Sequence, residues 1–236
     1  MKRLISRLST PASMLLSTLL ASGVFASSAQ AGAISYSFSN PYQKTEVRQS
    51  GTLSFFDSAL GHLTGVSFTF GGGLDTMIAL TNNSDHTEEL TATSVSRLFF
   101  SSNFAPLDAL INTGAPLLTL STSVSKEVEA NKTVSGNRAL ETRSVNWSPA
   151  ALSGIYEVFS RGPGEYFNIS CRSRSGLYAE GAGGNVTATQ SSSGFCAASI
   201  TYYYDNKVPE PATLALILTA GAGAGAGLAR RHRRQG

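Results

Sequence analysis

Hydrophobic and polar residues alternate along most of the middle of the chain with the two-residue period of β-strands. Residues 34–38 and 66–70 alternate without a break. Other short segments share this period or are rich in β-branched and aromatic residues: 52–56, 77–80, 90–100, 117–124, 155–159, 165–171, 186–190 and 195–204. Ten short strands separated by turn residues predict an all-β fold, an antiparallel β-sandwich or jelly-roll-like single domain.

Helical patterns are scarce in the same region. Residues 106–111 are long enough for one or two helical turns. Ser148 followed by Pro149 has the character of an N-cap and a first-turn proline, which predicts one short helix over 148–152. Three consecutive glycines at 71–73 are expected to end the strand at 66–70.

The first 31 residues have the parts of a secretory signal peptide. The chain opens with three basic residues: Lys2, Arg3 and Arg7. A largely apolar run follows at 14–26, and Ala29 and Ala31 form a small-residue A-x-A cleavage site. We therefore expect export through the secretion translocon and cleavage by signal peptidase after Ala31.

The last 29 residues contain three parts in a fixed order. A short motif comes first: Val208, Pro209, Glu210 and Pro211. The apolar segment 212–229 would make a helix of about 27 Å, close to the ~30 Å of a bilayer core, which predicts a transmembrane helix. The tail 230–236 then carries four arginines: Arg230, Arg231, Arg233 and Arg234. Such a cluster is costly to move across a bilayer, so the C-terminus is expected to stay cytoplasmic.

This string resembles the PEP-CTERM sorting signal, by which Gram-negative bacteria hand exported proteins to a membrane-embedded cysteine protease, the exosortase. The resemblance covers residues 208–236. It implies an exosortase as partner, an inner-membrane-anchored precursor, and later delivery to the cell surface or the extracellular matrix. The alternative is a permanent membrane anchor that is never cut.

A second resemblance lies in the body of the chain, residues 32–207. Residues 60–66 read LGHLTGV and are similar to the LGTLTGV-like signature of choice-of-anchor domains, nearest to type E. A late strand ending at 200–204 also fits that group. His62 stands where the signature has a threonine or another small residue. The resemblance implies an exported β domain that different bacteria attach by different anchors.

The whole chain has a formal net charge of +3, but the terminal targeting segments supply the excess of basic residues. Three basic residues lie in 1–31, and four more lie in 208–236 together with one acid, so the body keeps 11 basic and 14 acidic residues. A mildly acidic exported domain is not typical of a nucleic-acid-binding protein, and we expect no nucleic-acid partner.

The two cysteines of the chain, Cys171 and Cys196, are both expected on apolar, inward faces of strands. Cysteines in an oxidising compartment tend to pair, so we predict a disulfide, with two buried free thiols as the alternative. The two cysteines are 25 residues apart, and closing a loop of that length stabilises a fold by roughly 3.5 kcal/mol in the chain-entropy model.

Candidate chemistry is sparse. The body has two histidines, His62 and His86, and lacks the short motifs of serine hydrolases, zinc proteases and phosphate-binding loops. His62 is expected to be an exposed turn residue. The oxygen-rich segment 82–89 is interpreted as a solvated hairpin loop, with a calcium site as the alternative. We predict no catalytic residue, no metal site and no cofactor, and therefore a non-enzymatic protein.

Exposed aromatic side chains could stack on sugar rings, and the candidates are Trp147, Tyr178, Tyr202, Tyr203 and Tyr204. Together these observations indicate an exported structural or adhesive protein of the cell surface or of an exopolysaccharide matrix. Extracellular polysaccharide is then a candidate partner. The rival hypotheses are a secreted hydrolase or lyase that acts on that polysaccharide, and a carbohydrate-binding module.

Overall fold

The computed structural model describes residues 31–206, which fold almost entirely as β-strands. The strands are β1 (Ala31–Ser39), β2 (Gln43–Lys44), β3 (Arg48–Ser54), β4 (Phe56–Asp57), β5 (Gly61–Asn82), β6 (Glu88–Ser102), β7 (Leu118–Val128), β8 (Thr133–Trp147), β9 (Ser160–Arg161), β10 (Tyr166–Glu180) and β11 (Val186–Asn206). The helical elements are α1 (Ala105–Ile111) and the short 3₁₀ helices η1 (Tyr156–Phe159) and η2 (Ala182–Gly184).

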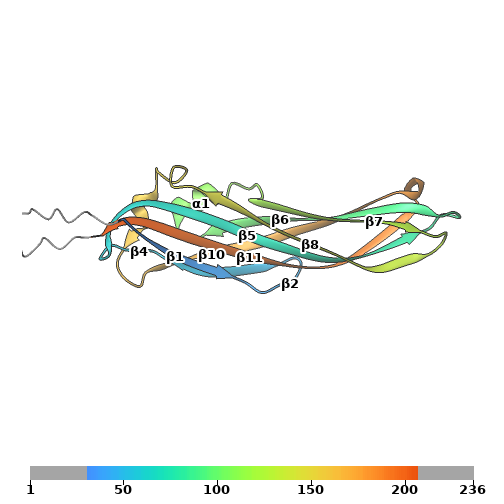
Figure 1. Ribbon diagram of the computed structural model, residues 1–236, viewed down its shortest axis with the longest axis horizontal. Helices are drawn as coiled ribbons and strands as arrows, with labels where there is room; N and C mark the ends of the chain where they lie inside the picture. The colour runs from blue at the N-terminus through green and yellow to red at the C-terminus, as the bar shows by residue number, and fades with distance from the viewer. Residues whose placement is uncertain (1–30, 207–236) are drawn as a thin grey trace, which may run out of the picture.

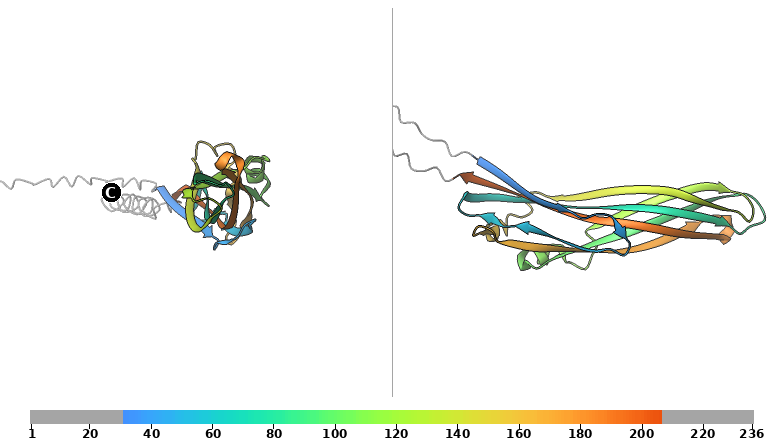
Figure 2. Two further views of the ribbon diagram at one scale, coloured as in Figure 1. Left: turned by 90° about the vertical axis from the view of Figure 1, so that its right-hand side faces the viewer. Right: turned by 90° about the horizontal axis from the view of Figure 1, so that it is seen from below.

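Nine strands form two antiparallel sheets that face one another, one of five strands and one of four (Figures 1 and 2). Sheet A has the order β1-β11-β5-β8, with the short β2 also paired to β11. Sheet B has the order β3-β10-β6-β7, and β4 and β9 form a small parallel pair beside them. The predicted all-β antiparallel sandwich is confirmed, and the order of the strands in the two sheets is jelly-roll-like.

The sandwich is elongated because two central strands of sheet A are unusually long (Figure 1). β5 has 22 residues and β11 has 21, which corresponds to roughly 70 Å of extended chain. Ala31 at the start of β1 pairs with Asp205 near the end of β11, so both ends of the described chain lie together, at what we call the base. The opposite end, the tip, is made by three loops: 83–87, 129–132 and 181–185.

The interior contains two hydrophobic clusters. The larger one, in the half nearer the base, is rich in fully buried aromatic side chains: Phe56, Phe68, Phe70, Phe100, Phe159, Phe167 and Tyr202. The smaller one lies near the tip and contains Ile78, Leu80, Leu90, Ala92, Val128 and Ala182. Between them the inward positions carry small hydroxyl side chains: Thr76, Ser94, Ser96, Thr122, Ser173 and Ser192. The base half therefore contributes most of the hydrophobic stabilisation, about 1.5–3 kcal/mol for each buried Phe or Leu.

The glycines at 71–73 do not end a strand, and that prediction is wrong. β5 runs through them without interruption, and at Gly72 and Gly73 other side chains occupy the space that a side chain would need. A Cβ on Gly72 would lie 2.2 Å from Leu98 Cδ1 in sheet B, and one on Gly73 would lie 2.3 Å from the ring of Phe195. These glycines serve close packing, and the strands predicted at 66–70 and 77–80 are one strand.

Three other local predictions fail or are incomplete. Residues 155–159 were expected as a strand, but they turn into η1 because consecutive turns from residue 148 onward bring Leu152 and Phe159 into the core. The short helix expected at 148–152 is present only as these turns. β8 was not predicted because it is an edge strand without a buried residue, so its hydrophobic alternation is weak.

The helix predicted at 106–111 is confirmed as α1, which buries Leu107 and Ile111 and has a proline in its first turn. Between residues 31 and 206, no helix has the length and hydropathy needed to cross a membrane. Most residues of the predicted signal peptide lie outside the described residues, Ala29 among them. So do the predicted transmembrane helix 212–229 and the sorting residues: Val208, Pro209, Glu210, Pro211, Arg230, Arg231, Arg233 and Arg234.

Candidate functional site

The predicted disulfide is confirmed and joins the two sheets. Cys171 in β10 and Cys196 in β11 are bonded with Cα atoms 6.4 Å apart, and both side chains are buried. Strand alternation places both residues on inward faces, as the sequence predicted. The bond covalently links sheet A to sheet B inside the larger hydrophobic cluster.

The two segments that resemble choice-of-anchor domains pair with each other at the base. Tyr202 lies opposite Val66, and Tyr203 lies opposite Gly65. A register shift follows, so that Tyr204 lies opposite Leu63 and Asp205 opposite His62. His62 is exposed, as expected, but it lies within β5 rather than in a turn, because the turn at 58–60 precedes the strand. That part of the prediction is wrong.

The five candidate stacking aromatics are not equivalent. Tyr202 is fully buried, and its hydroxyl donates a hydrogen bond to the Ser54 carbonyl of sheet B at 2.8 Å. Burial raises the pKa of the Tyr202 hydroxyl, and the nearby Tyr36 raises it further by a smaller amount. Trp147 is half-buried against Phe70, whereas Tyr178 on the outer face of sheet B is 54% exposed. Tyr178 and, to a lesser degree, Tyr203 therefore remain available to a ligand.

The segment 82–89 forms the tip connection between β5 and β6, but the prediction that it is a hairpin loop is wrong, because these two strands do not pair and the loop crosses from sheet A to sheet B. A buried asparagine, Asn82, organises it. The side-chain Nδ2 of Asn82 donates to the carbonyls of His86 and Val128 at 2.8 and 2.9 Å. Its Oδ1 accepts the backbone N–H and the hydroxyl of Ser84. Asn82 thereby ties this loop to the end of β7, and its amide groups are fully used inside the protein.

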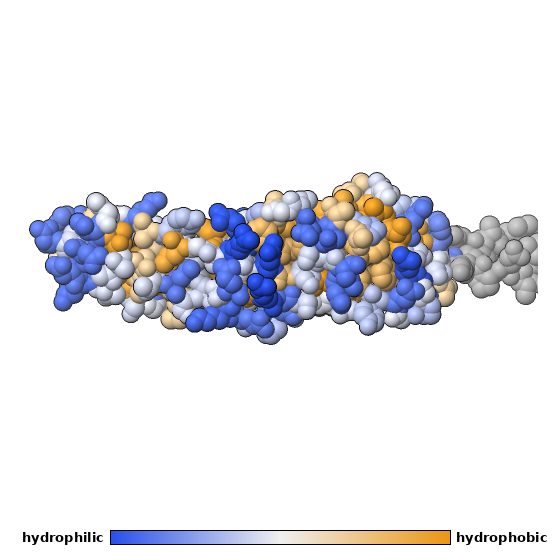
Figure 3. Space-filling model, turned by 180° about the vertical axis from the view of Figure 1, so that it is seen from behind, coloured by the Kyte–Doolittle hydropathy of each residue, from blue (hydrophilic) through white to orange (hydrophobic). Residues whose placement is uncertain are grey.

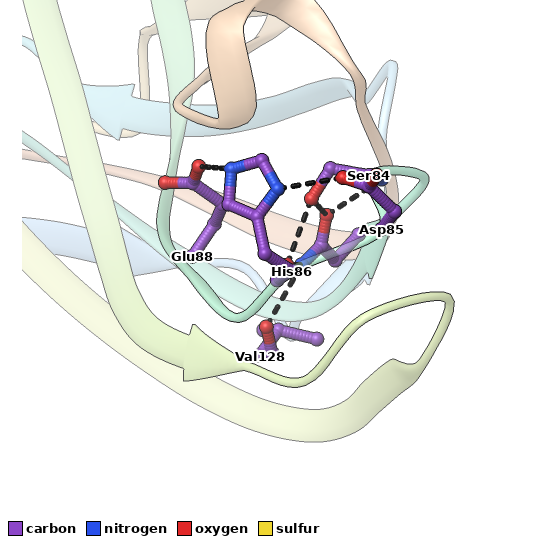
Figure 4. Close-up of polar contacts among 6 residues, drawn as sticks. Ser84, Asp85, His86, Glu88 and Val128 are labelled. Carbon is purple, nitrogen blue, oxygen red and sulfur yellow. Dashed lines mark hydrogen bonds and ion pairs between the residues drawn. The ribbon is translucent and has the colours of Figure 1, made fainter.

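Two carboxylates of the segment, those of Asp85 and Glu88, pair with His86. His86 Nδ1 lies 2.7 Å from Asp85 Oδ1, and Nε2 lies 2.6 Å from Glu88 Oε1 (Figure 4). Asp85 and then Glu88 raise the pKa of His86, while hydrogen bonding to His86 lowers the pKa of Asp85. Within residues 31–206, no three His, Cys, Asp or Glu side chains are arranged to hold a metal ion. Asp85, His86 and Glu88 thus form a charge network at the surface of the tip, where the side chains of His86 and Asp85 are largely exposed.

A cluster of arginines that the sequence did not reveal lies on the outer face of sheet B. Arg172 in β10 is directly opposite Arg48 in β3, and Arg174 in β10 is directly opposite Arg97 in β6. All four side chains are exposed. These residues are four of the ten lysines and arginines between residues 31 and 206. We call this set, together with Phe99, the arginine patch.

Phe99 forms the centre of the patch. The guanidinium carbon of Arg172 lies 5.4 Å from the centroid of the Phe99 ring, and that of Arg174 lies 5.5 Å from it. A shallow hollow of about 320 Å³ beside them is lined by Arg48, Arg172 and Phe99 and by three serines: Ser50, Ser101 and Ser170. Figure 3 views this side of the molecule and shows strongly hydrophilic side chains next to hydrophobic ones around the middle of its length.

The sequence contained only part of the signal for this patch. Arg172 and Arg174 are two residues apart in a predicted strand region, which places them on one face. Arg48 and Arg97 lie far away along the chain, and only the register of β3 and β6 against β10 brings them beside this pair. Strand register between distant segments is not encoded in local alternation.

Buried polar side chains between residues 31 and 206 are hydroxyls and amides, with Gln49 and Asn82 as the two amides. The charged pairs lie outside: Arg138 binds both carboxylate oxygens of Asp75 at 2.9 and 2.8 Å across β5 and β8, which lowers the pKa of Asp75. Asp75 and Arg138 thus pair with each other on the outer face of sheet A.

Comparisons with known proteins give little further guidance. No family model matches the chain, and no curated protein matches it. Among solved structures, a particle of infectious bursal disease virus has a chain 15% identical over 75% of this chain and 40% of its own, with a TM-score of 0.14. A mud crab tombus-like virus structure is 13% identical over 89% of this chain and 96% of its own, with a TM-score of 0.20. This chain thus spans less than half of the bursal disease virus protein, and likeness at these scores assigns no function.

Proposed function

We propose that this protein is an exported, non-enzymatic structural or adhesive protein of the cell surface or the extracellular polysaccharide matrix. An exosortase would recognise its C-terminal signal at 208–236. In this proposal the long sandwich is a spacer that carries its outer faces and its tip away from the membrane.

The observation that carries the proposal is the position of the two ends of the described part of the chain. Ala31 pairs with Asp205 at the base, whereas the loop that begins after Asn82 lies at the opposite end of β5. A membrane segment attached after Asn206 would therefore hold the base near the membrane. The rest of the molecule could project from it by a distance approaching the roughly 70 Å of β5. Such geometry suits display better than burial in a membrane-proximal complex.

The carboxyl groups also favour this proposal over a hydrolase or lyase. Catalytic carboxylates that act as acid and base usually lie in a cleft that shifts their pKa. In the described part of the chain, the carboxyl groups with a shifted pKa are Asp75 and Asp85, and each is explained by a neighbouring cation at the surface. Their pKa values are lowered, whereas a general acid needs a raised one.

The proposal is tested by following the C-terminus in a host that has an exosortase. Wild-type protein should lose the arginine-rich tail and appear outside the inner membrane. Replacing Pro209, Glu210 and Pro211 by alanine should leave an uncut membrane-bound precursor, which mass spectrometry of the C-terminal peptide identifies. As a control, replacing three residues of β3 by alanine, Ser50, Thr52 and Ser54, should leave processing intact. An intact tail on surface-located wild-type protein would refute the sorting step and indicate a permanent anchor.

The enzymatic rival has its own test. Purified protein should not release soluble products from polysaccharides of its host or from ester and peptide substrates. Turnover that one Asp, Glu or Ser substitution abolishes would reject the non-enzymatic assignment.

A further inference from the structure

The arginine patch places like charges at opposed positions of neighbouring strands, an arrangement that folding alone does not require. Like charges at directly opposed positions of neighbouring strands destabilise a sheet. β10 has two such pairs in succession, Arg172 with Arg48 and Arg174 with Arg97. In natural sequences such local conflicts mark positions retained for function more often than for folding.

No carboxylate in the described residues resolves the conflict. Arg138 and Arg143 on sheet A each form an ion pair, but none of the four patch arginines does so within residues 31–206. The nearby Glu46 uses its carboxylate to accept the backbone N–H of Ser175. The guanidinium groups of the patch also make no hydrogen bond to other residues between 31 and 206, so their N–H donors are free for a partner.

Stacking on Phe99 orders two of the guanidinium groups without consuming their donors. A guanidinium that lies over an aromatic ring is held by cation–π attraction through its face. Its N–H groups point outward in the plane and match the two oxygens of a carboxylate. Arg172 and Arg174 both lie within 6 Å of the Phe99 ring centroid. The patch thus presents two partly oriented carboxylate-binding groups, flanked by Arg48 and Arg97.

An aromatic platform continues the patch along the same strand. Tyr178 is on the same face of β10 as Arg172 and Arg174, about 20 Å along the strand from Arg172. A Cβ added to Gly176 would lie 3.6 Å from Cε2 of Tyr178, so this ring leans over Gly176 toward Arg174. An exposed tyrosine ring offers the flat surface on which the apolar face of a sugar ring stacks. Serine hydroxyls around the hollow can hydrogen-bond to sugar hydroxyls.

We propose that the arginine patch and Tyr178 bind an acidic polysaccharide, one that carries carboxylate groups, laid along the outer face of β10. Charge complementarity selects the carboxylates, and Tyr178 with the serines selects a sugar chain over other polyanions. This inference rests on the proposed function, since the patch meets matrix polysaccharide only if the protein is displayed outside the cell.

Binding is tested with the exported protein purified in detergent and immobilised for interferometry at low salt. Polygalacturonate is the acidic probe, dextran is the neutral one, and duplex DNA is the alternative polyanion. We expect binding of polygalacturonate, no binding of dextran, and weakening as added salt screens the charges. Binding of dextran as tight as that of polygalacturonate, or absence of polygalacturonate binding at low salt, would overturn the proposal.

Substitutions locate the site. R172A/R174A should weaken polygalacturonate binding about tenfold. R138A/R143A removes the same charge from sheet A and should change binding less than about twofold. Y178A should weaken polygalacturonate binding several-fold, whereas Y203A, on sheet A, should not. Equal effects of the two double-arginine variants would show that only net charge matters and would overturn the proposal. Duplex DNA that outcompetes polygalacturonate and depends on the same arginines would also overturn it, by indicating a nucleic-acid surface.

Two further readouts separate binding from folding and from sorting. Because like-charge repulsion is removed, R172A/R174A should have a thermal midpoint no lower than that of the wild type. A clearly lower midpoint would show that the arginines are structural, and R48A/R97A would then repeat the binding test from the other two strands. If sorting fails while polygalacturonate binding persists, only the proposed function is refuted. If sorting is normal and binding is absent, only this inference is refuted.

Discussion

The side chain of Gln49 in sheet B accepts a hydrogen bond from the backbone N–H of Cys196 in sheet A, with its Oε1 2.8 Å from the nitrogen. β1 pairs with β11 only up to Ala197, so the strand that would otherwise satisfy Cys196 has ended there. The Nε2 of the same amide donates to the Pro41 carbonyl at 2.8 Å. The Gln49 side chain thus supplies the hydrogen-bond acceptor that a longer β1 would have offered to Cys196, directly beside the disulfide.

Replacing Gln49 by leucine should lower the free energy of unfolding by about 1–3 kcal/mol, since it leaves the Cys196 N–H and the Pro41 carbonyl without these partners. Urea unfolding followed by circular dichroism measures the change. S50A, one residue along β3 and exposed, serves as the control and should stay within about 0.5 kcal/mol of wild type. A Gln49→Leu protein as stable as S50A would show that the amide has no structural role.

Removing the disulfide should destabilise the protein without changing its fold. Replacing both Cys171 and Cys196 by serine should reduce the free energy of unfolding by about 2–5 kcal/mol. The far-ultraviolet circular dichroism spectrum should remain that of a β protein. In the wild type, non-reducing peptide mapping should recover the two cysteines in one linked peptide pair. Two thiols that alkylate separately in native exported protein would contradict the pairing.

Tyr202 should make stability depend on alkaline pH. Its buried hydroxyl has a raised pKa, so the folded protein retains the proton that an unfolded tyrosine loses near its ordinary pKa of 10.0. Stability should therefore fall as pH rises above about 10, and part of this fall should disappear in Y202F. At neutral pH, Y202F should cost about 1 kcal/mol, because the Ser54 carbonyl loses its donor. An identical alkaline profile for Y202F and wild type would reject this assignment.

The imidazole of His86 should titrate above its ordinary pKa of 6.5, because Asp85 and Glu88 favour the protonated ring. A raised folded-state pKa stabilises the tip loop below about pH 6.5, and this stabilisation is lost as pH rises through the raised value. Nuclear magnetic resonance of the ring proton measures the titration, and H86Q assigns the signal. D85N and E88Q should each lower the pKa of His86. A value that neither substitution changes would mean that the two contacts do not persist in solution.

The strand content and the disulfide could be predicted from the sequence because both depend on local alternation. Inward and outward positions repeat every two residues, so an inward cysteine in each of two strands is visible before any fold is known. The same rule places consecutive tyrosines on opposite faces of a strand, and Tyr202 is buried while Tyr203 is exposed. Local alternation was too weak in the edge strand β8 for the same rule to work.

The sequence by itself determined an all-β domain with a paired cysteine bridge, and its two terminal segments predict export and sorting. Only the tertiary structure decided that the glycines at 71–73 lie within a strand, where Leu98 and Phe195 fill the space beside Gly72 and Gly73. It alone brought Arg48 and Arg97 to the two sides of β10. Pairing between segments tens of residues apart depends on how the whole sandwich packs, and local alternation contains no record of it.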